Sequence, residues 1–137
     1  MFVIKAAIDD PDAESFILPA QKTMYGGEEI AAGDMVFVFA SENEGGRGLI
    51  ARGVIEAAEA VARRPGVARQ TPRVGVTIRR TAPTSRPLGR TELKPFSCWN
   101  DGRPETELNF KLYRQATNKI VAISPATAAF LDRLFSA

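Results

Sequence analysis

Residues 33–56, GDMVFVFASENEGGRGLIARGVIE, decide the fold of this chain. An apolar run rich in aromatic and β-branched residues covers 35–39, a polar segment with Gly45 and Gly46 follows, and a second apolar run starts at Leu49. Two such runs around a glycine-containing loop predict a β-hairpin. Because both runs are nearly continuous in apolar character, the hairpin strands are expected to be covered on both faces.

The segments before the hairpin predict one strand and two short helical pieces. Residues 2–8 (FVIKAAI) contain β-branched and aromatic side chains and no helix or strand breaker, so they predict a strand. Pro11 suits the start of a helix, and a short helix is therefore expected over residues 13–18. Residues 21–27 (QKTMYGG) are expected to form a loop, and residues 28–32 one helical turn.

The segments after the hairpin predict three more strands and a final helix. Residues 74–81 and 108–113 alternate as half-buried strands do, residues 91–93 suggest a turn of helix, and 120–123 predict a further strand. Ser124 followed by Pro125 predicts the start of an amphipathic C-terminal helix. The whole pattern predicts a single α+β domain over residues 1–137, with about six strands in a small curved or barrel-like sheet.

The composition predicts a soluble cytoplasmic protein with no membrane partner. No run approaches the ~20 apolar residues that a membrane span needs, and the N-terminus does not resemble a signal peptide. Cys98 is the only cysteine, which fits a reducing compartment. We expect Cys98 to be a small buried apolar residue.

The sequence contains no histidine, and this excludes several kinds of site. A nucleophile activated by imidazole is impossible, and a zinc site of thiolates and imidazoles cannot form within one chain. Hydrolysis by a carboxylate pair or by Mg²⁺ on Asp and Glu stays open. The balance favours a binding protein that is not an enzyme and has no metal or cofactor.

The charges are distributed unevenly along the chain. Residues 1–62 hold four Lys and Arg against eleven Asp and Glu, so 4 − 11 = −7, and residues 63–137 hold fourteen against five, so 14 − 5 = +9. This asymmetry indicates either an anionic partner such as nucleic acid, or two halves that neutralise each other after folding. Arg63, Arg64, Arg69 and Arg73 form either a phosphate-facing segment or a mobile surface loop.

Three stretches, in order along nearly the whole chain, resemble the EVE domains and more distantly the YTH domains, both of the PUA-like fold. They are FVIKA at residues 2–6, the hairpin segment 33–55, and LYRQATNKIVAISPATAAFL at 112–131. The YTH pattern is interrupted, because Arg86, Pro87 and Leu88 occupy the region of its second cage tryptophan. The EVE resemblance is therefore the closer one.

The resemblance implies a PUA-like curved β-barrel with a pocket for a single base, often a modified one, in DNA or RNA. It implies that Lys5 approaches phosphate, that Tyr25 replaces a pocket tryptophan, and that Ser41 ends the first hairpin strand at the pocket mouth. It also implies an apolar pocket floor at Leu93 and a phosphate contact at Arg114, with Gln115 beside it. A flipped base needs faces to stack on and polar groups for its edge, and the flanking backbone needs cations.

Trp99 has two interpretations: it stacks on a base, or it plugs the core beside a turn. Phe37 and Phe39 lie two residues apart on one face and are expected in the core. The leading hypothesis is a nucleic-acid-binding module for one modified base. The alternatives are a binder of small nucleotide-like molecules, an unusual carboxylate-dependent hydrolase in the same pocket, or an interaction domain whose Pro-rich segment 82–95 docks another protein.

Overall fold

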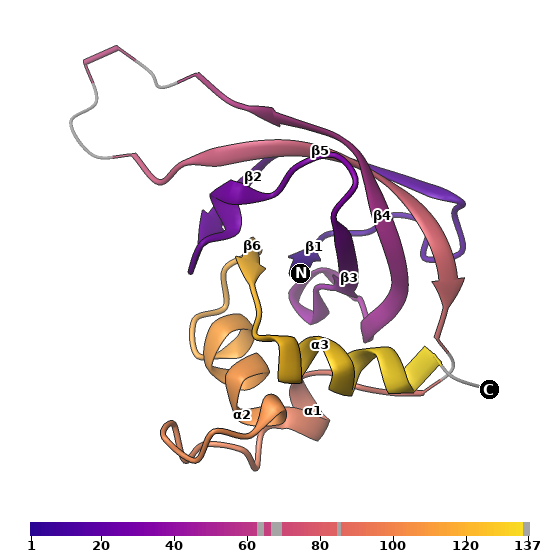
Figure 1. The fold of residues 1–137 in the computed structure, drawn as a ribbon, viewed down its shortest axis with the longest axis vertical. Coiled ribbons are helices and arrows are strands. Elements are labelled where there is room, and N and C mark those ends of the chain that lie inside the picture. Colours follow the sequence, from indigo (N-terminus) through magenta and orange to yellow (C-terminus); the bar gives the residue numbers. More distant parts are fainter. Residues whose placement is uncertain (63–64, 67–69, 85, 136–137) are drawn as a thin grey trace.

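Six strands close into a barrel in a computed structural model of the chain, which describes residues 1–62, 65–66, 70–84 and 86–135 (Figure 1). The order around the barrel is β1-β3-β4-β5-β2-β6. The predicted α+β class and the barrel-like sheet are confirmed. The strands are β1 (Phe2–Ala6), β2 (Ser15–Met24), β3 (Met35–Ala40), β4 (Gly48–Ala60), β5 (Arg73–Pro83) and β6 (Lys119–Ala122).

Seven short helical segments accompany the strands in the described part of the chain, and those between residues 90 and 135 cover one side of the barrel (Figure 1). They are η1 (Gly27–Glu29), η2 (Glu42–Glu44), α1 (Arg90–Leu93), α2 (Pro104–Leu108), the π-helix η3 (Asn109–Tyr113), α3 (Pro125–Asp132) and η4 (Arg133–Phe135). None of the helices in the described part of the chain is long and apolar enough to cross a membrane. Arg63, Arg64 and Arg69 lie outside the described residues.

The predicted hairpin is confirmed as β3 and β4, which pair antiparallel with Val38 opposite Ala51. β1 runs parallel to β3 on its other edge, with Val3 opposite Phe37. Every residue of β3 after Met35 is buried, so the strand is covered on both faces as its continuous apolar run predicted.

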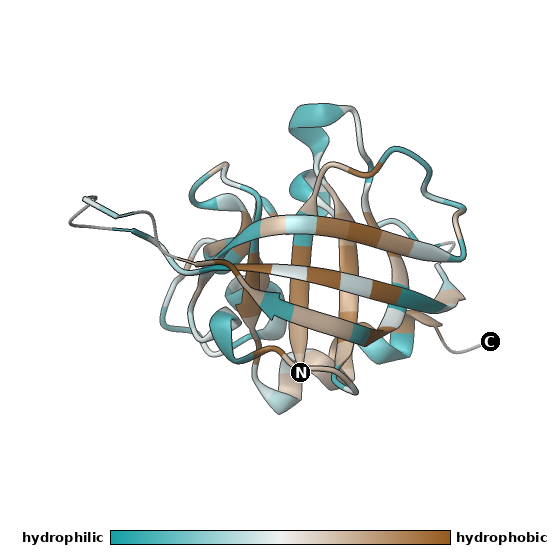
Figure 2. Ribbon diagram, turned by 90° about the horizontal axis from the view of Figure 1, so that it is seen from above, coloured by the Kyte–Doolittle hydropathy of each residue, from teal (hydrophilic) through white to brown (hydrophobic). Residues whose placement is uncertain are grey.

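Two apolar clusters account for this double burial. Alternate strand residues, among them Ile4, Val38 and Ile78, fill the barrel interior. The residues between them, such as Phe37 and Phe39, point outward and pack under the helices. Figure 2 shows the resulting alternation of apolar and polar colours along the long strands that run to the outer end of the β4–β5 hairpin.

The C-terminal helix starts as predicted. The Ser124 hydroxyl accepts a hydrogen bond from the Thr127 amide at 3.2 Å, and Pro125 occupies the first turn, where its missing N–H costs nothing. Leu131 is fully buried against the barrel, and Phe130 and Leu134 are partly buried in the same cluster.

Two of the predicted elements are wrong. Residues 13–18 are not helical, and from Ser15 onward they belong to β2, which continues through most of the predicted loop 21–27. Phe16 and Leu18 point inward, while Ile17 is 74% exposed. Because the outward residue is also apolar, the sequence lacks the alternation of apolar and polar residues that would predict a strand. Pro19 is accommodated at a β-bulge, where Ala20 has a φ of 50°.

Residues 108–113 are not a strand but the end of α2 and the π-helix η3. Leu108 and Leu112 are both buried. Residues four positions apart lie on one face of a helix and also on one face of a strand, so their spacing fits both structures. Short apolar segments leave the two periods unresolved. The informative signal was Pro104 at the helix start, followed by Glu105 and Glu107 in the first turn.

Candidate nucleic-acid interface

Three aromatic rings and one arginine meet on the surface where η3 faces the end of β2. The ring centroids of Tyr25 and Phe110 are 5.8 Å apart, and those of Phe110 and Trp99 are 5.4 Å apart in an edge-to-face arrangement. The Arg114 guanidinium carbon lies 4.1 Å from the Phe110 centroid, in cation–π contact. We call Tyr25, Trp99, Phe110 and Arg114 the aromatic patch.

Phe110 is the centre of the patch, and the two outer rings present the open surfaces. Tyr25 is 37% exposed and Trp99 is 45% exposed, whereas Phe110 is half-buried between them. Exposed rings that are held in place by contact with a third ring can stack on a planar ligand at little further entropic cost. Trp99 therefore does not plug the core. The prediction of a buried Cys98 is wrong, because Cys98 is exposed. Both residues lie in the turn before Asp101.

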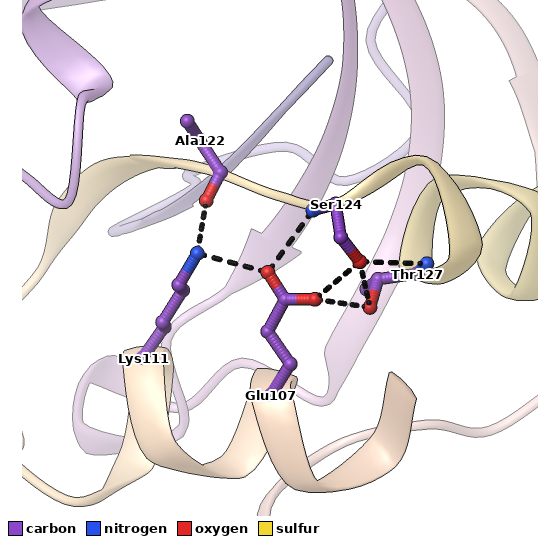
Figure 3. Close-up of polar contacts among 5 residues, drawn as sticks. All are labelled: Glu107, Lys111, Ala122, Ser124 and Thr127. Atoms are coloured by element: carbon purple, nitrogen blue, oxygen red, sulfur yellow. Dashed lines mark hydrogen bonds and ion pairs between the residues drawn. The ribbon is translucent and has the colours of Figure 1, made fainter. Parts of the chain in front are cut away.

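Lys111 links the patch to the barrel. Its ammonium donates hydrogen bonds to Glu107 at 2.8 Å and to the Ala122 carbonyl at 2.7 Å (Figure 3). The same ammonium lies 5.7 Å from the Tyr25 ring centroid. Glu107 also accepts bonds from Ser124 and Thr127 at the start of α3 (Figure 3). The backbone that carries Phe110 is thereby fixed to both β6 and α3.

Two buried lysines hold the other end of η3. Lys5 and Lys119 lie opposite each other on β1 and β6, and each is only 1% exposed. The Lys5 ammonium donates to the Leu112 carbonyl at 2.7 Å and lies 4.9 Å from the Tyr113 ring centroid, while Lys119 donates to the Gln115 carbonyl at 3.1 Å. Cations at unpaired C-terminal carbonyls are favourable, so both lysines position the loop that carries Arg114.

The loop between β3 and β4 meets the same region. The Tyr113 hydroxyl donates to the Glu42 carboxylate at 3.0 Å, and the Asn43 side chain donates to the Ala116 carbonyl at 3.2 Å. Ser41, at the end of β3, is 1% exposed, and its hydroxyl has no hydrogen-bond partner among the described residues. An unpaired buried hydroxyl is unusual in a folded chain.

The structure divides the predicted site residues into two groups. Tyr25, Trp99 and Arg114 come together in the aromatic patch, with Gln115 exposed beside Arg114. Lys5, Ser41 and Leu93 are buried instead, and Leu93 packs in the outer core cluster with Leu112. Tyr113 contacts Lys5 of the second group, and the next residue, Arg114, belongs to the aromatic patch. Segment 113–118 therefore connects the two groups.

Sequence reasoning missed Phe110 and Lys111, because both were placed in a predicted strand. The two residues lie in a π-helix, a rare element that is frequent at functional sites. Within the described ranges, no group of three or more Cys, Asp or Glu side chains is placed to hold a metal ion.

Burial, together with the smaller effect of the nearby charges of Lys5, Lys22 and Arg114, lowers the pKa of Lys119 to about 8. Unfolded chains keep this lysine protonated up to its ordinary value of 10.5, so folding releases a proton between these two pH values. We therefore expect the free energy of unfolding to increase by about 2 kcal/mol between pH 8 and pH 10, as measured by urea denaturation.

The variant Lys119→Met should flatten this rise, while Lys94→Met, which removes an exposed lysine, should preserve it. Burial and the Glu42 carboxylate raise the pKa of Tyr113, so its ionisation in the unfolded chain opposes the trend above pH 10. A wild-type stability that stays constant from pH 8 to pH 10 would contradict the prediction.

Solved structures share this fold, although no protein-family model and no curated protein matches the chain. The DUF55 domain of human thymocyte nuclear protein 1 superposes with a TM-score of 0.64 at 13% identity, over 98% of both chains. A protein from Pseudomonas putida superposes with a TM-score of 0.66 at 13% identity, over 98% of this chain and 99% of its own.

A third structure is that of the human THYN1 protein in complex with DNA that contains 5-methylcytosine. It superposes with a TM-score of 0.64 at 14% identity, over 99% of this chain and 97% of that one. These neighbours are EVE-type domains of the PUA-like fold, so the fold that the sequence resemblance implied is confirmed.

Proposed function

We propose that this protein binds nucleic acid through the aromatic patch and accommodates a single modified base there, without catalysing a reaction. The observation that carries the proposal is the packing of two exposed rings and one arginine around Phe110. Base–aromatic stacking contributes ~1–3 kcal/mol per base, and an adjacent cation supplies the phosphate contact.

The charges around the patch support an anionic ligand. Arg114 is exposed and forms no ion pair among the described residues, so its guanidinium keeps donors available for phosphate. Of the two ion pairs within the described part of the chain, only Arg52–Asp132 joins the acidic half to the basic half. The two halves therefore do not neutralise each other through ion pairs among the described residues. Most cations of the basic half are left to attract a polyanion.

Two observations support a modified base in particular. The human THYN1 protein, which shares the fold, was solved with DNA that contains 5-methylcytosine. In this chain the exposed rings of Tyr25 and Trp99 and the exposed guanidinium of Arg114 offer apolar and polar contacts to a base. Discrimination between a base and its methylated form rests on such apolar and polar contacts to the base.

The test is a fluorescence-anisotropy titration with matched oligonucleotides of DNA and RNA, with and without 5-methylcytosine, at several salt concentrations. Arg114→Ala is expected to weaken binding about 5- to 10-fold at low salt and to reduce the slope of log K against log salt by about 0.9, because one phosphate contact is lost. Arg133→Ala removes the same charge from η4, on the C-terminal side of α3, and should leave both values unchanged (Figure 1).

Absence of any binding at low salt, or equal behaviour of Arg114→Ala and Arg133→Ala, would overturn the proposal. Free nucleosides serve as a further arm, read out by thermal shift. Stabilisation by nucleosides together with no response to oligonucleotides would instead favour a binder of small nucleotide-like molecules.

A further inference from the structure

A hollow lies outside the aromatic patch, between the outer end of the β4–β5 hairpin and the segment of β2 that leads to η1. Its volume is about 730 Å³, which lies within the ~300–1,000 Å³ of small-molecule sites. Lys22 and Arg73 contribute the cations of its lining, and Ala60, Val61 and Val74 contribute apolar surface. We call this hollow the β-hairpin groove.

The side chains of the groove have two chemical characters. Val61 is 44% exposed and, with Ala60, offers an apolar surface. Arg73 donates one hydrogen bond to the Ala20 carbonyl at 2.9 Å, which fixes the guanidinium and leaves its other donors available. Neither Lys22 nor Arg73 forms an ion pair with a described residue, and Glu28 is the only acid among the described residues of the lining. An anion attached to a flat apolar group matches this combination.

The groove is close to the aromatic patch along the chain. Lys22 and Tyr25 lie three residues apart at the end of β2, which is at most about 10 Å of extended strand. A nucleic-acid strand whose base stacks on Tyr25 therefore reaches the groove within one or two nucleotides.

We infer that the β-hairpin groove holds a nucleotide that neighbours the base bound at the aromatic patch, with its phosphate at Lys22 and Arg73 and its sugar or base against Val61. This inference rests on the proposed function and extends it. The ligand is then an oligonucleotide that spans two subsites, and a free nucleoside occupies only one of them. An unstacked, single-stranded segment fits this arrangement, because both subsites contact a base or sugar face as well as phosphate.

The test compares Lys22→Ala with Lys94→Ala, which removes an equal charge next to α1, far from the hairpin end (Figure 1). With a single-stranded oligonucleotide that contains 5-methylcytosine, Lys22→Ala is expected to weaken binding about 5- to 10-fold at low salt and to lower the salt slope by about 0.7. Lys94→Ala should match the wild type, and Lys22→Arg should restore the slope. Val61→Glu, at an exposed position, places an acid in the groove and should weaken binding at least as much as Lys22→Ala.

The outcomes separate this inference from the proposed function. If the wild type binds and Arg114→Ala weakens binding, but Lys22→Ala and Val61→Glu behave like Lys94→Ala, the groove is no subsite and the proposed function stands. If the wild type binds no nucleic acid, the proposed function and the inference about the groove are both wrong. A Lys22→Ala effect that is equal for an oligonucleotide and for a free nucleoside would also overturn the two-subsite arrangement.

Discussion

Gly27→Ala is expected to lower the melting temperature by about 15 °C, which corresponds to roughly 4 kcal/mol for a chain of this size. A β-carbon at this position would lie 2.0 Å from the Ile120 carbonyl oxygen and 2.6 Å from the carbonyl carbon, both in the backbone of β6. Backbone atoms inside a closed barrel cannot rotate away as a side chain can, so η1 must separate from β6.

The same substitution should reduce nucleic-acid binding. Tyr25, two residues before Gly27, has a φ of 52°, and its carbonyl accepts a hydrogen bond from the Ala122 amide at 3.3 Å. Displacement of η1 from β6 breaks this contact and moves the Tyr25 ring out of the aromatic patch. Binding at a temperature where the variant is still folded measures this second effect.

Gly75→Ala is the matched control, because a β-carbon there meets only ordinary contacts at 3.5 Å or more, and its φ is outside the left-handed region. It should keep or slightly raise the melting temperature, since alanine restricts the unfolded chain more than glycine does. Equal melting temperatures for Gly27→Ala and Gly75→Ala would show that β6 and η1 are not in the contact described.

Glu107→Gln is expected to destabilise the protein by about 3 kcal/mol at pH 7, measured by urea denaturation. Both carboxylate oxygens accept hydrogen bonds, one from Lys111 and the Ser124 amide and the other from the hydroxyls of Ser124 and Thr127 (Figure 3). A glutamine amide places an NH₂ group against some of these donors and leaves Lys111 partly buried without its counter-ion.

The pH dependence identifies this cause. Burial raises the pKa of Glu107, but the hydrogen bonds from Lys111, Ser124 and Thr127 outweigh it and hold the pKa below its ordinary value of 4.5. The stabilisation is therefore complete above pH 4.5 and is lost as the pH falls through the lower folded value. Glu107→Gln should lose stability less steeply in acid than the wild type.

Glu105→Gln removes the same charge two residues earlier in α2 and should change stability by less than about 0.5 kcal/mol. A similar loss in both variants would mean that the helix dipole or overall charge, rather than the bonds to α3, accounts for the effect of Glu107.

The sequence was sufficient for those elements whose signals are local. Gly45 and Gly46 between two apolar runs predicted β3 and β4, and Ser124-Pro125 predicted the start of α3. The expected number of about six strands agrees with the structure, but only because two errors offset each other: the sequence pattern predicts a helix and a loop where β2 lies, and a strand at residues 108–113.

The candidate site was predictable in part, and the limit was long-range geometry. Tyr25, Trp99 and Arg114 were singled out, yet their common partner Phe110 was missed, because its role follows from the packing of three separate segments. Similarly, no local pattern shows that Lys5 is buried beneath η3, since a lysine in a strand is usually exposed. That placement depends on β6 pairing with β1, more than 100 residues away.

The π-helix η3 has a consequence for how such a patch arises and disappears. A π turn accommodates one residue more than an α turn, and each residue rotates a helix by ~100°. Loss of a single residue between Asn109 and Tyr113 would convert η3 to a regular continuation of α2 and turn Phe110 away from Arg114, Tyr25 or both. The barrel strands and their register need not change in that event. A one-codon deletion would therefore dismantle the aromatic patch while preserving the scaffold, and a one-codon insertion would form it.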